Sequence, residues 1–535
     1  MGSGYFSAWR SAPRALRARK SNLTPLIFLA CVVAAGARSI ALGKDGNWDL
    51  RNYHWYNAWA LLNGRLGWDL APAQVQTYYN PVGDLPFYFL VQWLPWPRHV
   101  AFWMALPAAI AAFFLIRILV LLFPPGAARG NLAWIAAACA IGVTGAAGQA
   151  TLGSTMNEWL SAAFLMAGLW LAVRGLAERP LEHPRALVAG ALLTGCAVGL
   201  KLTYAVFGLA YLVALLSVGS WREGAKRVAS GSAFMLAGFL IFGGYWAWVM
   251  QREFGNPVFP YYNDLFQSPW WEPVAFFDRN WGPRDLAQWI FFPLYFARRS
   301  TLVSEVGFRD YRLAALFVLG LLCLARFLLL PREKAAMRAW KFLITFALAS
   351  YITWIKLFGI YRYLVPLEVL SGPLIVGCLL YLLRGMALRY ACVVLLATLL
   401  VGTTRPGDWG RVPFGHAYFE VEAPQLPPDS LVIVGYIHPY AYEIPFFRSD
   451  ARFVSPVNNF LALGQRNLMA RSIDNLIRTH RGPVYLMQMK SGNSQDTATI
   501  QYFNLAFSGE RCLGVQSPMS DNYVQVCPLR PSGPA

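Results

Sequence analysis

The first residues that could do chemistry lie in a polar segment after the first long apolar run. Asp49 stands in the stretch Lys44–His54, close to the end of that run. A carboxylate at a lipid–water boundary is partly desolvated, which makes it a better base than in water. The alternative is that Asp49 is the N-cap of a helix over Leu50–Asn63. Arg51 and His54, in the same stretch, are candidate substrate-binding residues.

A second carboxylate, Glu158, stands where another apolar run begins. An anion is favoured at the N-terminus of a helix. The spacing Ser154-Thr155 to Glu158 also resembles a capping box, which would make the residue purely structural. The other interpretation is that Asp49 and Glu158 flank one substrate.

Three cations accompany these acids. Lys201 lies inside the apolar stretch Val198–Thr203, a position that is costly for a charge and typical of a functional site. Arg309 and Arg362 lie near the predicted outer ends of two further spans. Together the three cations could neutralise a phosphate at the outer membrane surface. For Arg309 and Arg362, simple snorkelling to the interface is the competing explanation.

The stretch Gly255–Asn263, with Trp270 and Trp271 after it, is rich in rings and rigid turns. Aromatic belts at membrane interfaces explain much of this composition. Sugar-binding sites also use aromatic faces, and Tyr262 is the candidate substrate-binding residue here.

Several classes of protein are disfavoured. The six histidines are scattered without the spacing of a zinc site. There is no phosphate-binding P-loop, dinucleotide fingerprint or nucleophile elbow. The net charge of +19 comes from short clusters between apolar runs, so nucleic acid is not an expected partner. We expect no cofactor, and a divalent metal is not indicated.

The elements that must position these residues are membrane helices. Hydrophobic residues make up 57% of the chain and charged residues 14%, against about 25% charged in soluble domains. About eleven spans are predicted from the apolar runs. They are Thr24–Leu42, Val100–Phe123, Leu132–Gly148, Trp159–Ala177, two within Ala186–Val218, Val228–Met250, Leu313–Leu330, Phe342–Ile355, Leu364–Leu383 and Tyr390–Val401.

The cations orient these spans. Six basic connections fall on one side if the spans alternate, and the positive-inside rule makes that side cytoplasmic. The prediction is a basic cytoplasmic N-terminus over 1–23 and a membrane module over 24–403 with outer loops at 43–98 and 251–312. Residues 404–535 form a small extracytoplasmic α/β domain. The short apolar piece Leu85–Leu94 is predicted to be interfacial or re-entrant, since as a span it would invert everything downstream.

We expect a multi-pass membrane protein whose candidate site residues and C-terminal domain lie outside the cytoplasm, which in a bacterial inner membrane means the periplasm. Six of the eight cysteines lie in apolar runs. Cys512 and Cys527 lie in the tail and are a plausible disulfide if the tail is outside the cytoplasm.

The combination resembles the GT-C superfamily of membrane glycosyltransferases, over roughly residues 24 to 400. The resemblance rests on the first outer loop (Asp49, Tyr53 and Tyr79-Asn80-Pro81), on Gly199–Thr203 and on Tyr361-Arg362-Tyr363. In that superfamily an acid after the first helix is the proposed base, a position that Asp49 fits best, with Asp45 as fallback. Glu158 matches the second acidic position, where it replaces an aspartate.

The resemblance implies an inverting transfer from a polyprenyl-phosphate sugar. Asp49 would deprotonate an acceptor hydroxyl, and Lys201, Arg309 or Arg362 would offset the charge of the departing polyprenyl phosphate. The acceptor would be a glycan, a lipid or a protein. A metal-independent member is favoured, because the first loop carries no neighbouring pair of acids.

Two other functions stay open. One is a transporter or flippase of lipid-linked saccharides, although inverted repeats and broken helices at the midplane are not evident. The other is an accessory membrane subunit whose tail binds a partner.

Overall fold

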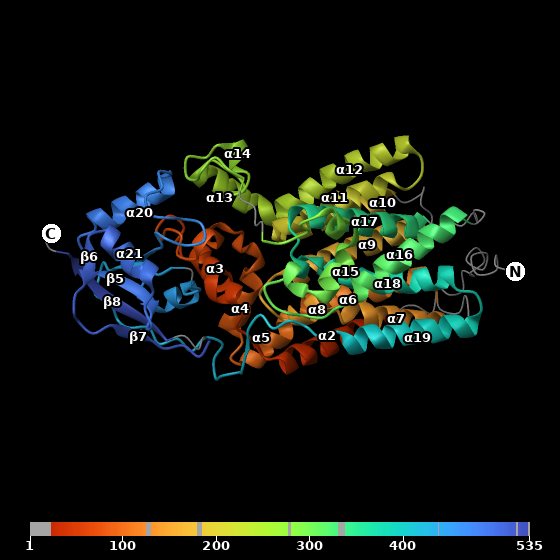
Figure 1. Cartoon of the computed structure of the whole chain (residues 1–535), viewed down its shortest axis with the longest axis horizontal. Coiled ribbons are helices and arrows are strands. Elements are labelled where there is room, and N and C mark those ends of the chain that lie inside the picture. Colours follow the sequence, from red (N-terminus) through yellow and green to blue (C-terminus); the bar gives the residue numbers. More distant parts are fainter. Residues whose placement is uncertain are drawn as a thin grey trace.

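A computed structural model describes residues 23–124, 130–178, 184–275, 280–329, 338–436, 438–519 and 523–532. The molecule is elongated, with a helical bundle at one end and the C-terminal sheet at the other (Figure 1). The helices of the first outer loop lie between these two parts. The N-terminal segment 1–23, which was predicted to be basic and cytoplasmic, lies outside the described residues except for Leu23.

Each predicted span coincides with a helix or a pair of helices. They are α2 (Leu23–Leu42), α5 (Pro97–Met104) with α6 (Leu106–Leu122), α7 (Asn131–Val143), α9 (Glu158–Glu178), α10 (Pro184–Leu200), α11 (Ala205–Leu216), α12 (Trp221–Phe239) with α13 (Tyr245–Phe254), α16 (Arg312–Leu329), α17 (Arg338–Leu357), α18 (Val365–Leu382) and α19 (Met386–Thr403).

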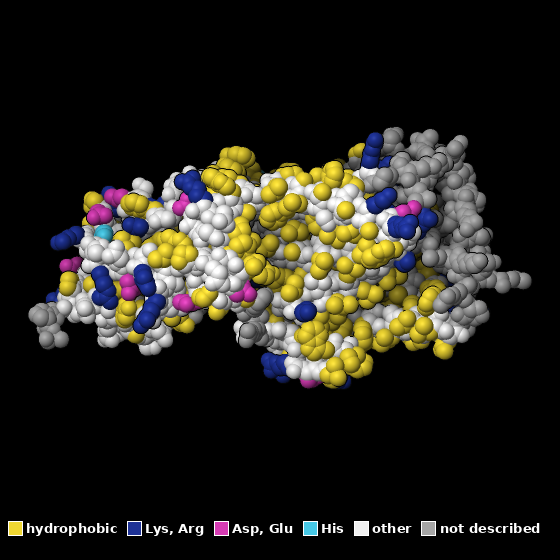
Figure 2. Space-filling view, turned by 90° about the horizontal axis from the view of Figure 1, so that it is seen from above, with side chains coloured by type: hydrophobic (Ala, Val, Ile, Leu, Met, Phe, Trp, Pro, Cys, Tyr) yellow, Lys and Arg dark blue, Asp and Glu magenta, His cyan; other side chains and the backbone are white. Residues whose placement is uncertain are grey.

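Seven helical segments in the described part are long and apolar enough to cross a bilayer. Three shorter apolar helices, α7, α10 and α11, pack among them. Apolar side chains cover much of the visible face of the bundle, while Lys and Arg lie both on the sheet part and near the opposite end of the bundle (Figure 2). The predicted class, a polytopic helical membrane protein, is confirmed.

The two long loops predicted to lie outside, 43–98 and 251–312, contain ordered helices. The first holds a π-helix, η3 (Leu50–His54), continued by α3 (Trp55–Leu62), and the short helix α4 (Leu85–Trp93). At nine residues α4 is too short to span, since a bilayer needs about 20. The second contains α14 (Asn263–Phe266) and α15 (Leu286–Arg298), whose many exposed apolar side chains were not foreseen for an outer loop.

The C-terminal part is a mixed sheet with helices, as predicted. Its strands run in the order β4-β3-β5-β8-β6, with β7 on β8. Their bounds are β3 (Leu431–Val434), β4 (Arg452–Val454), β5 (Val484–Met489), β6 (Leu505–Phe507), β7 (Leu513–Val515) and β8 (Val524–Pro531), joined by α20 (Leu468–Thr479) and α21 (Ser494–Tyr502).

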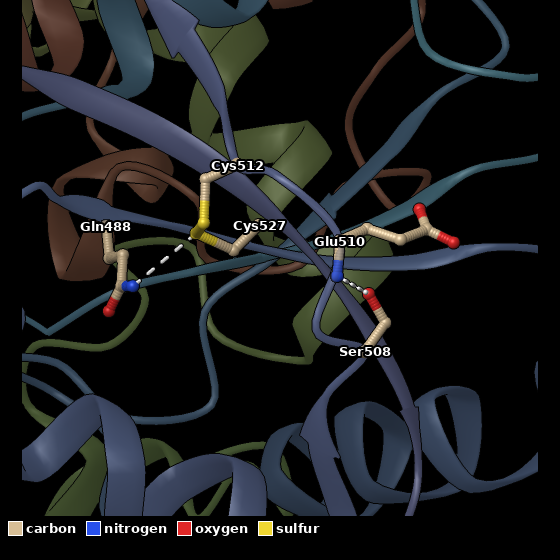
Figure 3. The surroundings of a disulfide bond; sticks show 5 residues. All are labelled: Gln488, Ser508, Glu510, Cys512 and Cys527. Atoms are coloured by element: carbon tan, nitrogen blue, oxygen red, sulfur yellow. Dashed lines mark hydrogen bonds between the residues drawn. A yellow bond between two sulfur atoms is a disulfide. The ribbon is translucent and has the colours of Figure 1, made fainter.

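The predicted disulfide is present. Cys512 and Cys527 are bonded between the segment before β7 and strand β8 (Figure 3). Gln488, on β5, donates a hydrogen bond to the Cys527 sulfur at 3.7 Å. The disulfide therefore fastens the short strand β7 to the middle of the sheet.

The first outer loop and the C-terminal part share their hydrophobic cores. Loop residues such as Val75 and Tyr78 pack in one cluster with Ile433 and Phe460. Strand β1 (Lys44–Asp45) pairs with β2 (Arg411–Val412), which ties the start of the loop to the linker after α19. The sheet is thus held directly against the segment that carries Asp49.

A buried network of charges lies in the bundle. Arg312 donates to Asp310 at 2.8 Å and to the carbonyls of Ile141 and Thr144. Asp310 also accepts from the Ala146 N–H. Every charged atom of these side chains has a partner, so the network fixes where the helices meet.

Candidate active site

Asp49 lies at the start of η3, with no capping hydrogen bond from its side chain. The interpretation of Asp49 as an N-cap is therefore wrong. One carboxylate oxygen, Oδ2, instead accepts a hydrogen bond at 2.8 Å from the Arg362 guanidinium. Arg362 belongs to η9 (Tyr361–Leu364), which leads into α18. This ion pair therefore joins the first loop to the segment that leads into α18.

Glu158 begins α9, and its side chain is fully buried. Lys201, between α10 and the short helix after it, donates to Glu158 Oε1 and to the Met156 carbonyl, both at 2.6 Å. The capping-box interpretation fails, because the Ser154 N–H donates to Thr151 and the Thr155 N–H to Asp45. Glu158 is therefore free of a capping role.

The two ion pairs form one cluster. The Nε of Arg362 lies 4.0 Å from Glu158 Oε1, so the four charges alternate in sign. Both cations also lie over the ring of Tyr363, Lys201 at 5.2 Å and Arg362 at 5.6 Å from its centroid. The structure brings together four of the candidate site residues, which are Asp49, Glu158, Lys201 and Arg362.

Several polar atoms in and next to this cluster have no hydrogen-bond partner. Glu158 Oε2, Arg362 Nε and His54 Nε2 are buried and make no hydrogen bond within the described protein. A buried polar atom without a partner costs about 1–3 kcal/mol. Several such atoms close to one ion-pair cluster are typical of a site that receives a polar ligand.

The electrostatics of Asp49 differ from the prediction. Burial raises the pKa of its carboxyl, but the neighbouring Arg362, His54 and Lys201 together outweigh burial and hold that pKa below its ordinary value. The expectation that desolvation alone would make Asp49 a stronger base is therefore wrong for the protein as described. Weakening the contact with Arg362, the largest of these opposing influences, would raise the pKa of Asp49.

His54 has a partner that the sequence analysis missed. Its Nδ1 lies 2.6 Å from Asp84 Oδ1, and both side chains are buried. Asn157, the residue before Glu158, donates to the same oxygen at 2.7 Å. Asp84 directly precedes the apolar stretch whose membrane placement was ambiguous, which is the only signal that could have marked it.

Asp45, the fallback base, is a structural residue. Its two oxygens accept hydrogen bonds from Asn47 and from the backbone and side chain of Thr155. These bonds tie the first outer loop to the segment before α9. Asn80, in the quoted Tyr79-Asn80-Pro81 motif, similarly donates to carbonyls of Gly199 and Phe242.

The remaining candidates lie elsewhere. Arg51 interacts with Glu443 of the C-terminal part, where burial raises the pKa of the carboxyl and the charge of Arg51 offsets a small part of that rise. Arg309 is exposed, and its backbone pairs with that of Arg405. Within the described residues, the ion pairs of Asp49 and Glu158 involve Arg362 and Lys201 and do not include Arg309.

Tyr262 lies at the start of α14 with positive φ and is 46% exposed. Its neighbour Tyr261 is the residue whose hydroxyl contacts Tyr79, at 2.5 Å. Tyr79 in turn packs edge-on against Tyr53, next to His54. Which of two adjacent tyrosines faces the first loop depends on the irregular backbone, so the sequence did not distinguish them.

Comparison with known proteins finds a similar fold among solved structures. No protein-family model matches the chain, and no curated protein sequence does. The fold is similar to that of ArnT from Cupriavidus metallidurans bound to undecaprenyl phosphate, with a TM-score of 0.51 and 13% identity over 95% of this chain and 98% of that chain. ArnT in the apo state gives a TM-score of 0.40 at 12% identity, over 95% and 99% of the two chains. At such identity the likeness concerns the fold.

Proposed function

We propose that this protein is a glycosyltransferase that moves a sugar from a polyprenyl-phosphate donor to an acceptor hydroxyl at the outer face of the membrane. The observation that carries the proposal is the cluster of Asp49, Glu158, Lys201 and Arg362, with buried atoms that lack partners. The likeness to a structure that binds undecaprenyl phosphate supports the choice of donor. The lipid bilayer supplies the donor's path to the site.

The cluster suggests how the donor would prepare the base. Its four side chains carry two positive and two negative charges, so an incoming phosphate must compete with a carboxylate for a cation. Arg362 is the better candidate, because its Nε has no hydrogen-bond partner in the described protein. A phosphate that binds Arg362 weakens the ion pair with Asp49, and the pKa of Asp49 then rises toward that of a useful base.

The transfer then follows an inverting course. Asp49 accepts the proton of the acceptor hydroxyl, the hydroxyl oxygen attacks the anomeric carbon, and the bond from that carbon to the phosphate oxygen breaks. Polyprenyl phosphate leaves with the electron pair, its charge offset by Lys201 and Arg362. Glu158 keeps Lys201 in place through the 2.6 Å bond. No metal is part of the proposal.

The orientation belongs to the proposal as well. A disulfide is rare in the cytoplasm and common in the bacterial periplasm, and Cys512–Cys527 lies in the C-terminal sheet. That sheet packs on the same loop that carries Asp49. The disulfide and the active-site cluster therefore lie on one side of the membrane, which supports a periplasmic site and an inner-membrane location.

Reconstitution tests the proposal. The purified chain would be placed in liposomes with undecaprenyl-phosphate pentoses and hexoses and an envelope extract as acceptor, and free undecaprenyl phosphate would be measured. The glycosyltransferase releases it, whereas a flippase moves the intact donor and an accessory subunit does neither. Absence of release with every donor would overturn the proposal.

A further inference from the structure

His54 and Asp84 form a carboxylate–imidazole pair that the transfer described above does not use. The 2.6 Å contact joins His54 Nδ1 to an oxygen of Asp84, and the side chains are 3% and 2% exposed. Asn157 donates to that same oxygen, so Asp84 is held from two sides. When Asp84 is ionised its oxygens only accept hydrogen bonds, so the hydrogen of the neutral imidazole then sits on Nδ1. The buried Nε2 then carries a lone pair and has no partner in the described protein.

The backbone places this imidazole beside Asp49. Residues Leu50–His54 form a π-helix that starts from Asp49. A π-helix closes hydrogen bonds between residues five apart, so Asp49 and His54 lie about one turn apart along it. Such π-turns inside α-helices occur frequently at functional sites. An electrostatic interaction between Asp49 and His54 is consistent with this proximity.

We propose that His54, held by Asp84, is a second proton acceptor of the active site. It takes from Asp49 the proton that the acceptor hydroxyl gives up, and this step rests on the transferase function proposed above. The proton moves from the Asp49 carboxyl to His54 Nε2, and Asp84 stabilises the imidazolium through Nδ1–H. After the product leaves, His54 returns the proton to water, so no other reactant is needed.

The direction of transfer follows from ordinary chemistry. An imidazole is a stronger base than a carboxylate by about two to three pKa units in model peptides. Burial raises the pKa of Asp84, although His54 and Asn157 oppose this rise. A positive charge on the adjacent imidazole would therefore stabilise the ionised Asp84. Without such an acceptor, a protonated Asp49 would have to lose its proton inside a buried cluster before Arg362 could pair with it again.

The test compares His54→Gln with the wild type. Glutamine keeps a hydrogen-bonding side chain but takes up no proton at neutral pH. We expect kcat for release of undecaprenyl phosphate to fall about 100-fold, the lower end for acid–base catalysis, while KM for the donor changes little. Asp84→Asn should act in the same direction by a smaller factor. His99→Gln, an exposed histidine on α5, is the matched control and should leave kcat unchanged.

The pH profile separates a proton acceptor from a structural residue. His54 interacts with Tyr53, Asp49 and Asp84. The charged or titratable groups next to these three are Tyr79, Lys201 and Arg362. Among these side-chain types and histidine, only an imidazole ordinarily titrates between about pH 5 and 8. The wild type should therefore lose kcat on acidification through that range, and His54→Gln should show a flat profile there.

Rescue provides the second measurement. Imidazole added to a His54→Ala variant should restore part of kcat, and restoration should follow the neutral fraction of the added imidazole. Unchanged kcat and an unchanged acid limb in His54→Gln would overturn the proposal while leaving the transferase intact. The proposal would also be overturned if the His54 variants lost kcat but kept the acid limb of the pH profile and were not rescued by imidazole. The role of His54 would then be structural only. Absence of turnover in the wild type would overturn both proposals.

Discussion

Two regions of the molecule bury charges of both signs, and they differ in how completely those charges are satisfied. In the network of Arg312 and Asp310, each charged atom has a partner, including carbonyls and N–H groups of α7 and the turn after it. In the cluster of Asp49, Glu158 and Arg362, buried atoms remain unpaired. The network of Arg312 and Asp310 therefore stabilises the packing of the helices, whereas the cluster of Asp49, Glu158 and Arg362 has polar atoms that can still bind a ligand.

Glu368 extends the contrast. Its two oxygens accept from the N–H groups of Ala147 and Gly148, so a glutamate inside the bundle can be wholly occupied by backbone. Glu158, equally buried, uses one oxygen for Lys201 and leaves the other free. Glu368 and Glu158 are therefore equally buried and differ in whether an oxygen is left without a hydrogen-bond partner.

The largest effect is expected at Asp49. Asp49→Asn removes the proposed base and the counter-charge of Arg362, so transfer should fall by at least about 1000-fold. The measurement is release of undecaprenyl phosphate by the reconstituted variant. Asp45→Asn is the matched control: it should lower thermal stability, because Asp45 holds Thr155, yet retain transfer per folded molecule. Full turnover by Asp49→Asn would remove Asp49 from the mechanism.

Arg312→Met should act on stability. Removing one partner from a buried ion pair typically costs about 3–5 kcal/mol, because the other charge is left unpaired. The midpoint of thermal unfolding in detergent should fall, while the donor KM of the folded fraction stays at the wild-type value. Replacing both charges, Asp310→Asn with Arg312→Met, should recover part of the loss. If donor affinity changed instead, the comparison between the two regions would fail.

The residues of the cluster could be selected from the sequence, but their contacts with one another could not. Asp49 and Glu158 were found because acids at the mouths of apolar runs are conspicuous, and Lys201 because a cation in such a run is costly. Their pairing was not predictable, since Asp49 and Arg362 are 313 positions apart. The lowered pKa of Asp49 depends on that pairing, so the sequence suggested the wrong direction.

The fold shows the same division between local and distant information. Helix spans follow from runs of apolar residues, and each has a counterpart in the structure. In the C-terminal part, Thr497–Phe507 reads as one helix, yet the helix ends at Tyr502. Leu505–Phe507 is instead a strand paired with β8, after Asn504 turns the chain with positive φ. The helix ends there because the following residues pair with the distant strand β8, and that pairing cannot be predicted from the local sequence.

Lys201→Gln should weaken donor binding. The lysine is one of two cations available for the phosphate, and a hydrogen bond to a charged group contributes about 1.5–3 kcal/mol. We expect KM for an undecaprenyl-phosphate sugar to rise about 10- to 100-fold, with a smaller change in kcat. The double variant Glu158→Gln with Lys201→Gln separates charge from stability, since it leaves no unpaired buried carboxylate. A wild-type KM in both variants would contradict the phosphate site.

Glu443 gives a pH-dependent effect on stability. Burial raises the pKa of this carboxyl to about 8, although Tyr442 and Arg51 oppose the shift. The folded protein therefore keeps a proton that the unfolded chain releases above about pH 4. Stability is fully present below that pH and declines as the pH rises toward 8. Glu443→Gln should abolish the decline, so its unfolding midpoint should exceed that of the wild type at pH 8 by more than at pH 5.

The smallest effect is expected at Arg309, which the sequence grouped with Lys201 and Arg362. The structure leaves its side chain exposed, and its backbone rather than its guanidinium bonds to Arg405. An exposed cation contributes at most about 1 kcal/mol to an ionic contact, and salt screens it. Arg309→Gln should therefore change KM for the donor less than about fivefold at low salt and not at all in 0.5 M salt. A larger, salt-resistant loss would mean that the lipid phosphate reaches Arg309, and the cluster at Asp49 would then be only part of the donor site.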